Sequence, residues 1–338
     1  MSLTTSIVLF AISAVVIGIV GTRLTRVVDE LADRTGLGEA LAGAVLLGMA
    51  TSLSGIVLSF TAALEGQPEL AMSNALGGIA VQTLFLTVAD ICLRRVNLEH
   101  AAASLGNLMQ GTLLLCMLAL ILVGSYSPEL TLWSIHPVTP LLVLGYFLGL
   151  RIVRQGQTYP MWKPARTRET KEDVPDEASK KNSLIVLWLS FLLMALILGI
   201  TGWLLQRTAT VIAMQTGMSQ AAVGVLLTSI VTSLPELVTS VAAVRRGALT
   251  LAVGGIIGGN AFDTLFAAAS DIAYREGSIY HAISHEVLLW VALSLLMTGV
   301  LLLGLLRRQT YGFADIGFES AILIGLYLTG AVIVLSGG

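Results

Sequence analysis

Charged residues are scarce in this chain of 338 residues, at 12% of the total. A soluble domain carries roughly 25% charged residues, and here 55% of the residues are hydrophobic instead. The low charge content excludes an ordinary soluble globular protein. It indicates an all-α polytopic membrane protein, because a helix satisfies every backbone polar group inside its own segment.

Cysteine is also nearly absent, with only Cys92 and Cys116, each in or beside an apolar run. Two such residues exclude a disulfide framework, and no spacing of cysteine and histidine indicates a zinc site. The N-terminus has no basic residue before an apolar run that continues to about Val20. That run is too long for the core of a signal peptide, so we interpret it as a first spanning helix that is retained.

Long apolar stretches, by contrast, fill most of the chain. Taking stretches of about 18 to 25 residues as membrane spans, the sequence predicts ten transmembrane helices, arranged as two inverted five-helix repeats. Their predicted ranges are 3–22, 39–63, 70–93, 101–124, 136–153, 184–206, 219–244, 249–272, 286–306 and 317–336.

One polar segment divides these helices into two groups of five. Residues 154–183 are rich in Lys, Arg, Glu and Pro, so they cannot build a hydrophobic core and are typical of a linker. We therefore predict a first half at 1–153, with a repeat at about 35–91, a cytoplasmic linker at 154–183, and a second half at 184–338, with a repeat at about 216–272.

Basic residues are distributed unequally between the two predicted faces. One face has seventeen of the nineteen Lys and Arg residues, while the other has only Arg207 and Arg275. Because cytoplasmic loops carry an excess of Lys and Arg, we expect the first face to be cytoplasmic and both termini to lie outside. The expected location is the cell (inner) membrane.

The two halves contain an internal repeat. Sliding the sequence by 181 positions aligns 35–91 with 216–272 without a gap, so that the sequence TSL at 51–53 meets TSL at 232–234. An odd number of spans per half turns the second copy upside down. Inverted repeats with helices broken near the middle of the membrane are typical of alternating-access transporters.

The second copy of this motif contains a carboxylate within an apolar run. Glu236 follows Pro235 between about Ala221 and Val244, and a carboxylate in hydrocarbon must protonate, pair or bind a cation. The proline breaks the helical ladder beside Thr232 and Ser233, so hydroxyl and carbonyl oxygens are expected at the same depth. Hard oxygen donors of this kind suit Na⁺ or Ca²⁺.

Two more acidic residues recur in the repeat. Asp90 and Asp271 end the third and eighth predicted helices. Their positions near the interface favour a role at the helix end or in a salt bridge over ion binding, with Arg94 and Arg95 as expected partners of Asp90.

Taken together, the two repeats resemble the sodium/calcium exchanger (cation/Ca²⁺ antiporter) superfamily, with a degenerate first repeat. In that family, two glutamates from the two helix breaks flank a central cation site, completed by Asn or Asp from the third and eighth helices. The second repeat matches well. The first has Gly55 where the partner glutamate is expected, and Ser54 in place of the proline.

This resemblance implies a set of cation ligands drawn from both repeats. Asp263 lies one helical turn beyond Asn260, on the same face. Only two carboxylates are present, so the site chemistry also suits a monovalent cation exchanged for protons. The expected ligands are Glu236, Asp263, Asn260, Thr232, Ser233, Thr51, Ser52, Gln82 and Asn74.

The expected function is secondary-active antiport of Ca²⁺ or another cation against Na⁺ or H⁺. The alternatives are a monovalent Na⁺/H⁺ antiporter, a membrane sensor or scaffold that transports nothing, and an intramembrane hydrolase. The sequence argues against the hydrolase, because it has neither a Ser/His pair at one membrane depth nor a paired-aspartate motif. We therefore expect no enzyme activity and no resident cofactor. The expected partners are inorganic cations and the lipid bilayer, without nucleic acid.

Overall fold

The computed structural model describes residues 1–35, 51–93, 96–158, 160–165, 167, 183–312 and 316–336, and this part of the chain is helical throughout apart from its loops. The elements of the first half are α1 (Leu3–Thr35), α3 (Leu53–Leu64), α4 (Pro68–Ile91), α5 (Leu98–Ala102), α6 (Leu105–Tyr126) and α7 (Val138–Thr158). Those of the second half are α8 (Leu184–Thr216), α9 (Gln220–Val223), the π-helical turn η1 (Gly224–Thr228), α10 (Ser229–Thr232), α11 (Leu234–Arg246), α12 (Leu249–Ala273), α13 (His285–Arg307) and α14 (Phe318–Ser336).

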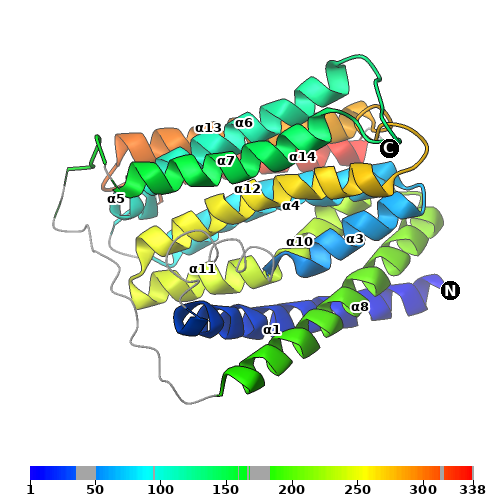
Figure 1. Ribbon diagram of the computed structural model, residues 1–338, viewed down its shortest axis with the longest axis horizontal. Coiled ribbons are helices and arrows are strands. Elements are labelled where there is room, and N and C mark those ends of the chain that lie inside the picture. Colours follow the sequence, from blue (N-terminus) through cyan, green and yellow to red (C-terminus); the bar gives the residue numbers. More distant parts are fainter. Residues whose placement is uncertain are drawn as a thin grey trace.

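The protein is a multi-pass, all-α membrane protein. Within the described residues, eight helices are long and apolar enough to cross a bilayer, and the bent pair Gln220–Thr232 and Leu234–Arg246 makes a ninth span if it is counted as one. The helix predicted at 39–63 is described only from its C-terminal part, as the short apolar helix α3, because residues 36–50 lie outside the described part. Both termini lie at one end of the bundle, and α5 lies at the other (Figure 1).

Two helices run well past the ends predicted for them. The first was predicted to end at 22 and the sixth at 206, but α1 and α8 both contain 33 residues and end at Thr35 and Thr216. Hydropathy marks the edge of the apolar stretch and not the end of the helix, and no Pro or Gly interrupts either helix after that edge. Gly217, with a left-handed φ of 75°, ends α8.

The offset of 181 residues relates the two halves over a longer stretch than the predicted repeat. Leu3 and Leu184 begin α1 and α8, and the same offset relates the starts of α3 and α11 and of α4 and α12. It relates the starts of α6 and α13 and of α7 and α14 to within one residue. The long helices therefore follow the same order in both halves, whereas α5 has no helical counterpart at 279–283.

Three layers make up the bundle (Figure 1). The long helices α1 and α8 cross each other on one side and pack against α11 and α3, respectively. The central helices α4 and α12 lie against each other, and α6, α7, α13 and α14 cover their other side. The central pair is therefore the most enclosed part of the molecule, and 19 residues of α4 are buried.

Asp90 and Asp271 hold the ends of the central helices through equivalent hydrogen bonds. Asp90 Oδ1 accepts from the backbone N–H of Leu98, and Asp271 Oδ1 accepts from that of Ile279, eight residues further on in each case. The second oxygen of each reaches the other half: Asp90 Oδ2 accepts from Gly317 N and Ser320 Oγ, and Asp271 Oδ2 accepts from His136 N and Thr139 Oγ1. The helix-end role describes both residues, while Arg94 and Arg95 lie outside the described residues.

Candidate cation site

The site forms where two helices break at equivalent serines. Ser233 has φ −95° and ψ 6° at the start of α11, and Ser52 has φ −91° and ψ 5° at the start of α3. The helix axis bends by 46° at Ser233, between Gln220–Thr232 and Leu234–Arg246. Because Ser54 replaces the proline in the first repeat, the shared backbone conformation shows that this break does not require proline on both sides.

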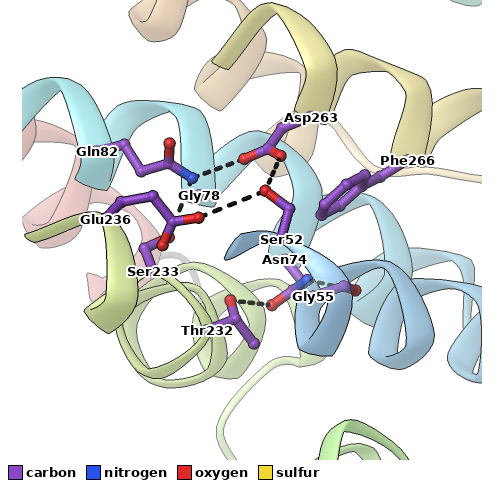
Figure 2. Close-up of a pocket in the computed structure, with 10 residues that line it drawn as sticks. All are labelled: Ser52, Gly55, Asn74, Gly78, Gln82, Thr232, Ser233, Glu236, Asp263 and Phe266. Atoms are coloured by element: carbon purple, nitrogen blue, oxygen red, sulfur yellow. Dashed lines mark hydrogen bonds between the residues drawn. The ribbon is translucent and has the colours of Figure 1, made fainter. Parts of the chain in front are cut away.

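A cavity of about 10 Å³ lies between these breaks and the central helices, about the room that one water molecule needs. Seven of the nine predicted ligands line it, and all nine are buried. The cavity is lined by Ser52, Gly55, Asn74, Gly78, Gln82, Thr232, Ser233, Glu236, Asp263 and Phe266 (Figure 2).

Glu236 and Asp263 share one hydroxyl in this cavity. Ser52 Oγ lies 2.6 Å from Asp263 Oδ1 and 3.4 Å from Glu236 Oε1, with both carboxylates pointing toward it (Figure 2). A hydroxyl has a single proton to donate, so it satisfies only one of these acceptors at a time. Thr51 is a further hydrogen-bond partner of Glu236.

Gln82 completes the polar ring from α4. Its Nε2 donates to Asp263 Oδ2 at 2.6 Å and to Ser233 Oγ at 3.3 Å. Its Oε1 has no hydrogen-bond partner, and neither has Glu236 Oε2. Buried acceptors without donors are costly, so the cavity presents free oxygens from two residues to whatever enters it.

The two predicted asparagines play different parts. Asn74 lines the cavity, but its amide is used between helices: Nδ2 donates to Gly55 O and Ser59 Oγ, and Oδ1 accepts from Thr228 at 2.8 Å. Asn260 lies outside the lining and donates from Nδ2 to Ile79 O and Thr83 Oγ1 on α4. Its Oδ1 has no hydrogen-bond partner.

No positive side chain of the described residues balances the two carboxylates, because the cavity lining that they form contains no Lys, Arg or His. Within the described residues, no group of three or more His, Cys, Asp and Glu side chains is placed to hold a metal ion. A cation in this cavity would therefore take its charge balance from Glu236 and Asp263 and its remaining ligands from neutral oxygens.

Phe266 is a lining residue that the sequence did not single out as part of the site. A Cβ atom added at Gly55 would lie 2.9 Å from Phe266 Cε2, so the ring occupies the space beside the glycine. Phe85 and Phe266 occupy equivalent positions of the internal repeat. The sequence therefore does not indicate that Phe266 lines the cavity and Phe85 does not. The ring closes the side of the cavity from which the resemblance expects a second glutamate.

Two inverted halves around buried carboxylates at a pair of helix breaks define a transporter of cations. The family model described as "Sodium/calcium exchanger protein" matches residues 5–153 and 185–336. The chain belongs to the sodium/calcium exchanger family.

Curated relatives and solved structures agree with this placement. The chain is 26% identical over 259 residues to the inner membrane protein YrbG of Escherichia coli K12, covering 76% of each. It is 29% identical over 285 residues to CaxA of Alkalimonas amylolytica, covering 83% of this chain and 85% of that protein.

Two solved structures share the fold. The chain matches YfkE with a TM-score of 0.66 at 15% identity, covering 97% of this chain and 92% of the other. It matches the sodium-calcium exchanger NCX_Mj with a TM-score of 0.59 at 18% identity, covering 98% and 99%.

Proposed function

We propose that the protein is a secondary-active antiporter that moves Ca²⁺ or another cation against Na⁺ or H⁺, with Glu236 and Asp263 as the charged ligands. The observation that carries this proposal is the pair of buried carboxylates on one Ser52 hydroxyl, with no cationic side chain among the described residues that line the cavity. Two such carboxylates need protons or a cation between them. Competition for one site by two kinds of cation is the basis of antiport.

The inverted repeat supports alternating access as the way in which the site reaches both sides of the membrane. We propose two different roles for the remaining predicted ligands. Ser52, Gln82, Ser233 and Thr232 line the cavity and offer neutral oxygens, and Thr51 is a hydrogen-bond partner of Glu236. Asn74 and Asn260 hold the helices that present these residues. We also propose that the first half of the protein ends at residue 153 and that the second half begins at residue 184.

We also propose that the protein lies in the inner membrane with both termini outside. The excess of Lys and Arg on one predicted face supports this orientation. The similarity to a relative that is named an inner membrane protein supports the assignment to the inner membrane. Most of the predicted linker at 154–183 lies outside the described residues.

Monovalent cation/proton exchange is the second candidate, and the two-carboxylate count favours it. A Ca²⁺ site takes six to eight oxygens with enough negative charge to offset dehydration. Here Gly55 supplies no carboxylate, and Phe266 closes the space beside it. A site with fewer negative charges suits Na⁺, which would bind in exchange for protons on Glu236 or Asp263.

Ion flux into proteoliposomes separates these functions. Radioactive Ca²⁺ uptake driven by a Na⁺ or pH gradient supports the first proposal, and Na⁺ uptake driven only by a pH gradient supports the second. Glu236→Gln should abolish either flux, while Glu276→Gln, an exposed acid, should leave it unchanged. If no ion moves under any gradient and Glu236→Gln alters nothing, the transport proposal is wrong.

A further inference from the structure

A second pair of carboxyl groups lies at the end of the bundle that holds α5, outside the cavity lining. Glu99 on α5 and Glu319 on the first turn of α14 are each 1% exposed. All four of their carboxyl oxygens are buried without a donor partner. The two carboxyl groups are close neighbours in this buried space.

The backbone around Glu319 leaves room for its carboxyl group. A Cβ atom at Gly304 would lie 2.9 Å from Glu319 Cδ, and one at Gly317 would overlap its Oε1. Any larger residue at these two positions would displace the carboxyl. The side chain is thus seated between two glycines, in a place that water does not reach.

The charged and titratable groups around the pair have described partners of their own. Asp90 on α4 accepts three hydrogen bonds. His100 bonds through its ring nitrogens to Arg308 O and Thr167 Oγ1, and Arg308 donates to His100 O. Arg307 lies over the ring of Phe318, 4.9 Å from its centroid.

Two carboxylates in contact cannot both be ionised without a large repulsion, and burial adds a cost for each charge. A carboxylic acid that donates to a carboxylate removes most of both costs, as in other paired carboxyl groups that share one proton. Within the described residues, no further acidic, cysteine or histidine side chain joins this pair to hold a metal ion. A proton is the ligand that fits this geometry.

We propose that Glu99 and Glu319 form a proton-binding site that joins the two halves of the protein at the α5 end of the bundle. Glu99 belongs to the first half and Glu319 to the second, so the shared proton links α5 to α14. Loss of that proton places two negative charges side by side next to Asp90 and weakens the link.

The opposite end of the molecule lacks such a site. The offset of 181 relates Glu99 to Tyr280 and Glu319 to Val138. There, Tyr280 forms a hydrogen bond of 2.9 Å with Thr139, and burial raises the pKa of Tyr280 further above its ordinary value. The equivalent positions at that end therefore hold no pair of carboxyl groups.

The direction of the pH effect follows from burial. Burial, then the neighbouring charges of Asp90 and Glu319, raise the pKa of Glu99 well above its ordinary value. A group with a raised folded-state pKa binds a proton in the folded state that the unfolded chain has already lost. Its stabilisation is complete below the unfolded pKa and is lost as the pH rises through the folded pKa.

The test is the pH dependence of thermal unfolding of the full-length protein. Glu99→Gln keeps an amide donor for Glu319 but removes one titrating group, so the variant should match wild type near pH 5 and be more stable near pH 8. We expect the difference in Tm between variant and wild type to grow by about 3 °C or more over this range. Glu319→Gln should behave in the same way, and Tyr280→Phe, at the equivalent position of the other end, should not change the slope.

A Tm difference that stays constant with pH overturns the proposal. Should both glutamine variants fail to fold, infrared spectroscopy of a protein with Glu236→Gln and Asp263→Asn provides a second readout, because Glu99 and Glu319 remain intact there. A protonated carboxyl C=O band that persists near pH 7 supports the shared proton, and its absence overturns it. Neither readout depends on transport.

Discussion

The amide of Gln82 donates to Asp263 Oδ2 at 2.6 Å, and these two residues occupy equivalent positions of the two repeats. One copy of the position has kept a carboxylate and the other has an amide that binds it. The pair therefore contributes one unit of negative charge to the site, where two acids would contribute two. This charge balance is the basis of the first prediction.

Gln82→Glu should shift ion preference toward divalent cations. A third carboxylate near the ion adds on the order of 4 kcal/mol of attraction per unit of ion charge at about 4 Å and an effective dielectric near 20, before its own desolvation is subtracted. We expect at least about a tenfold rise in the affinity for Ca²⁺ relative to Na⁺, measured as the cation-induced change in Tm. Gln110→Glu, on α6 and outside the cavity lining, is the control, and an unchanged preference in Gln82→Glu would contradict the prediction.

Gly55→Ala should destabilise the protein by about 1–3 kcal/mol, because its Cβ atom would lie 2.9 Å from the ring of the buried Phe266. Gly78→Ala is a matched change on the same cavity, since its nearest contact would be Ser233 Oγ at an ordinary 3.8 Å. Chemical or thermal unfolding of the two variants measures the difference. Equal stabilities would show that Phe266 does not limit the space at Gly55.

Gly55→Glu combined with Phe266→Ala restores room and charge together. We expect this double variant to bind Ca²⁺ more tightly than either single variant, because the added carboxylate can enter the cavity only when the ring is gone. Calorimetric titration with Ca²⁺ measures the effect. Tighter binding in Gly55→Glu alone would mean that the ring already moves aside.

Gly202→Ala should weaken the packing of α8 on the first helix break. Its Cβ atom would lie 2.5 Å from the backbone oxygen of Ser54, which has no flexible end to move. We expect a loss of about 1–3 kcal/mol in stability. Gly199→Ala, whose nearest contact would be Val57 at 4.0 Å, should be neutral or gain up to about 1 kcal/mol from helix propensity. A smaller loss in Gly202→Ala than in Gly199→Ala would be the contrary result.

Asp271→Asn should destabilise the end of α12. Its carboxylate accepts from two backbone N–H groups and from Thr139 Oγ1, and an amide cannot accept all three bonds in the same geometry. We expect a cost of about 1–3 kcal/mol, seen as a lower Tm, whereas the exposed Glu276→Gln should cost almost nothing. Equal Tm values in the two variants would show that the clamp contributes little.

Much of the fold could be read from the sequence because the hydrophobic stretches are long and the repeat is ungapped. The membrane class, the family and the break at Ser233 all follow from local patterns. The ends of α1 and α8 did not, since hydropathy reports where the apolar face stops and the helix continues through charged residues. The full extent of the repeat was also missed, because it is visible in side-chain contacts such as those of Asp90 and Asp271 more than in residue identity.

The site was predictable as a set of residues and not as a geometry. Glu236 could be found because a carboxylate in an apolar run needs an explanation. The role of Phe266 could not, because a matched aromatic in each repeat reads as packing until one ring is seen against Gly55. The Glu99 and Glu319 pair is far apart in sequence and has no motif, so only the fold brings it together.

The offset of 181 residues gives the positions of one half counterparts in the other half. A substitution made at Gly21, which packs on Pro235, can thus be repeated at Gly202, which packs on Ser54. The two changes probe equivalent contacts in the two halves. The chain therefore contains its own internal control, and a difference in activity or stability between such mirrored variants measures how far the two halves differ in function.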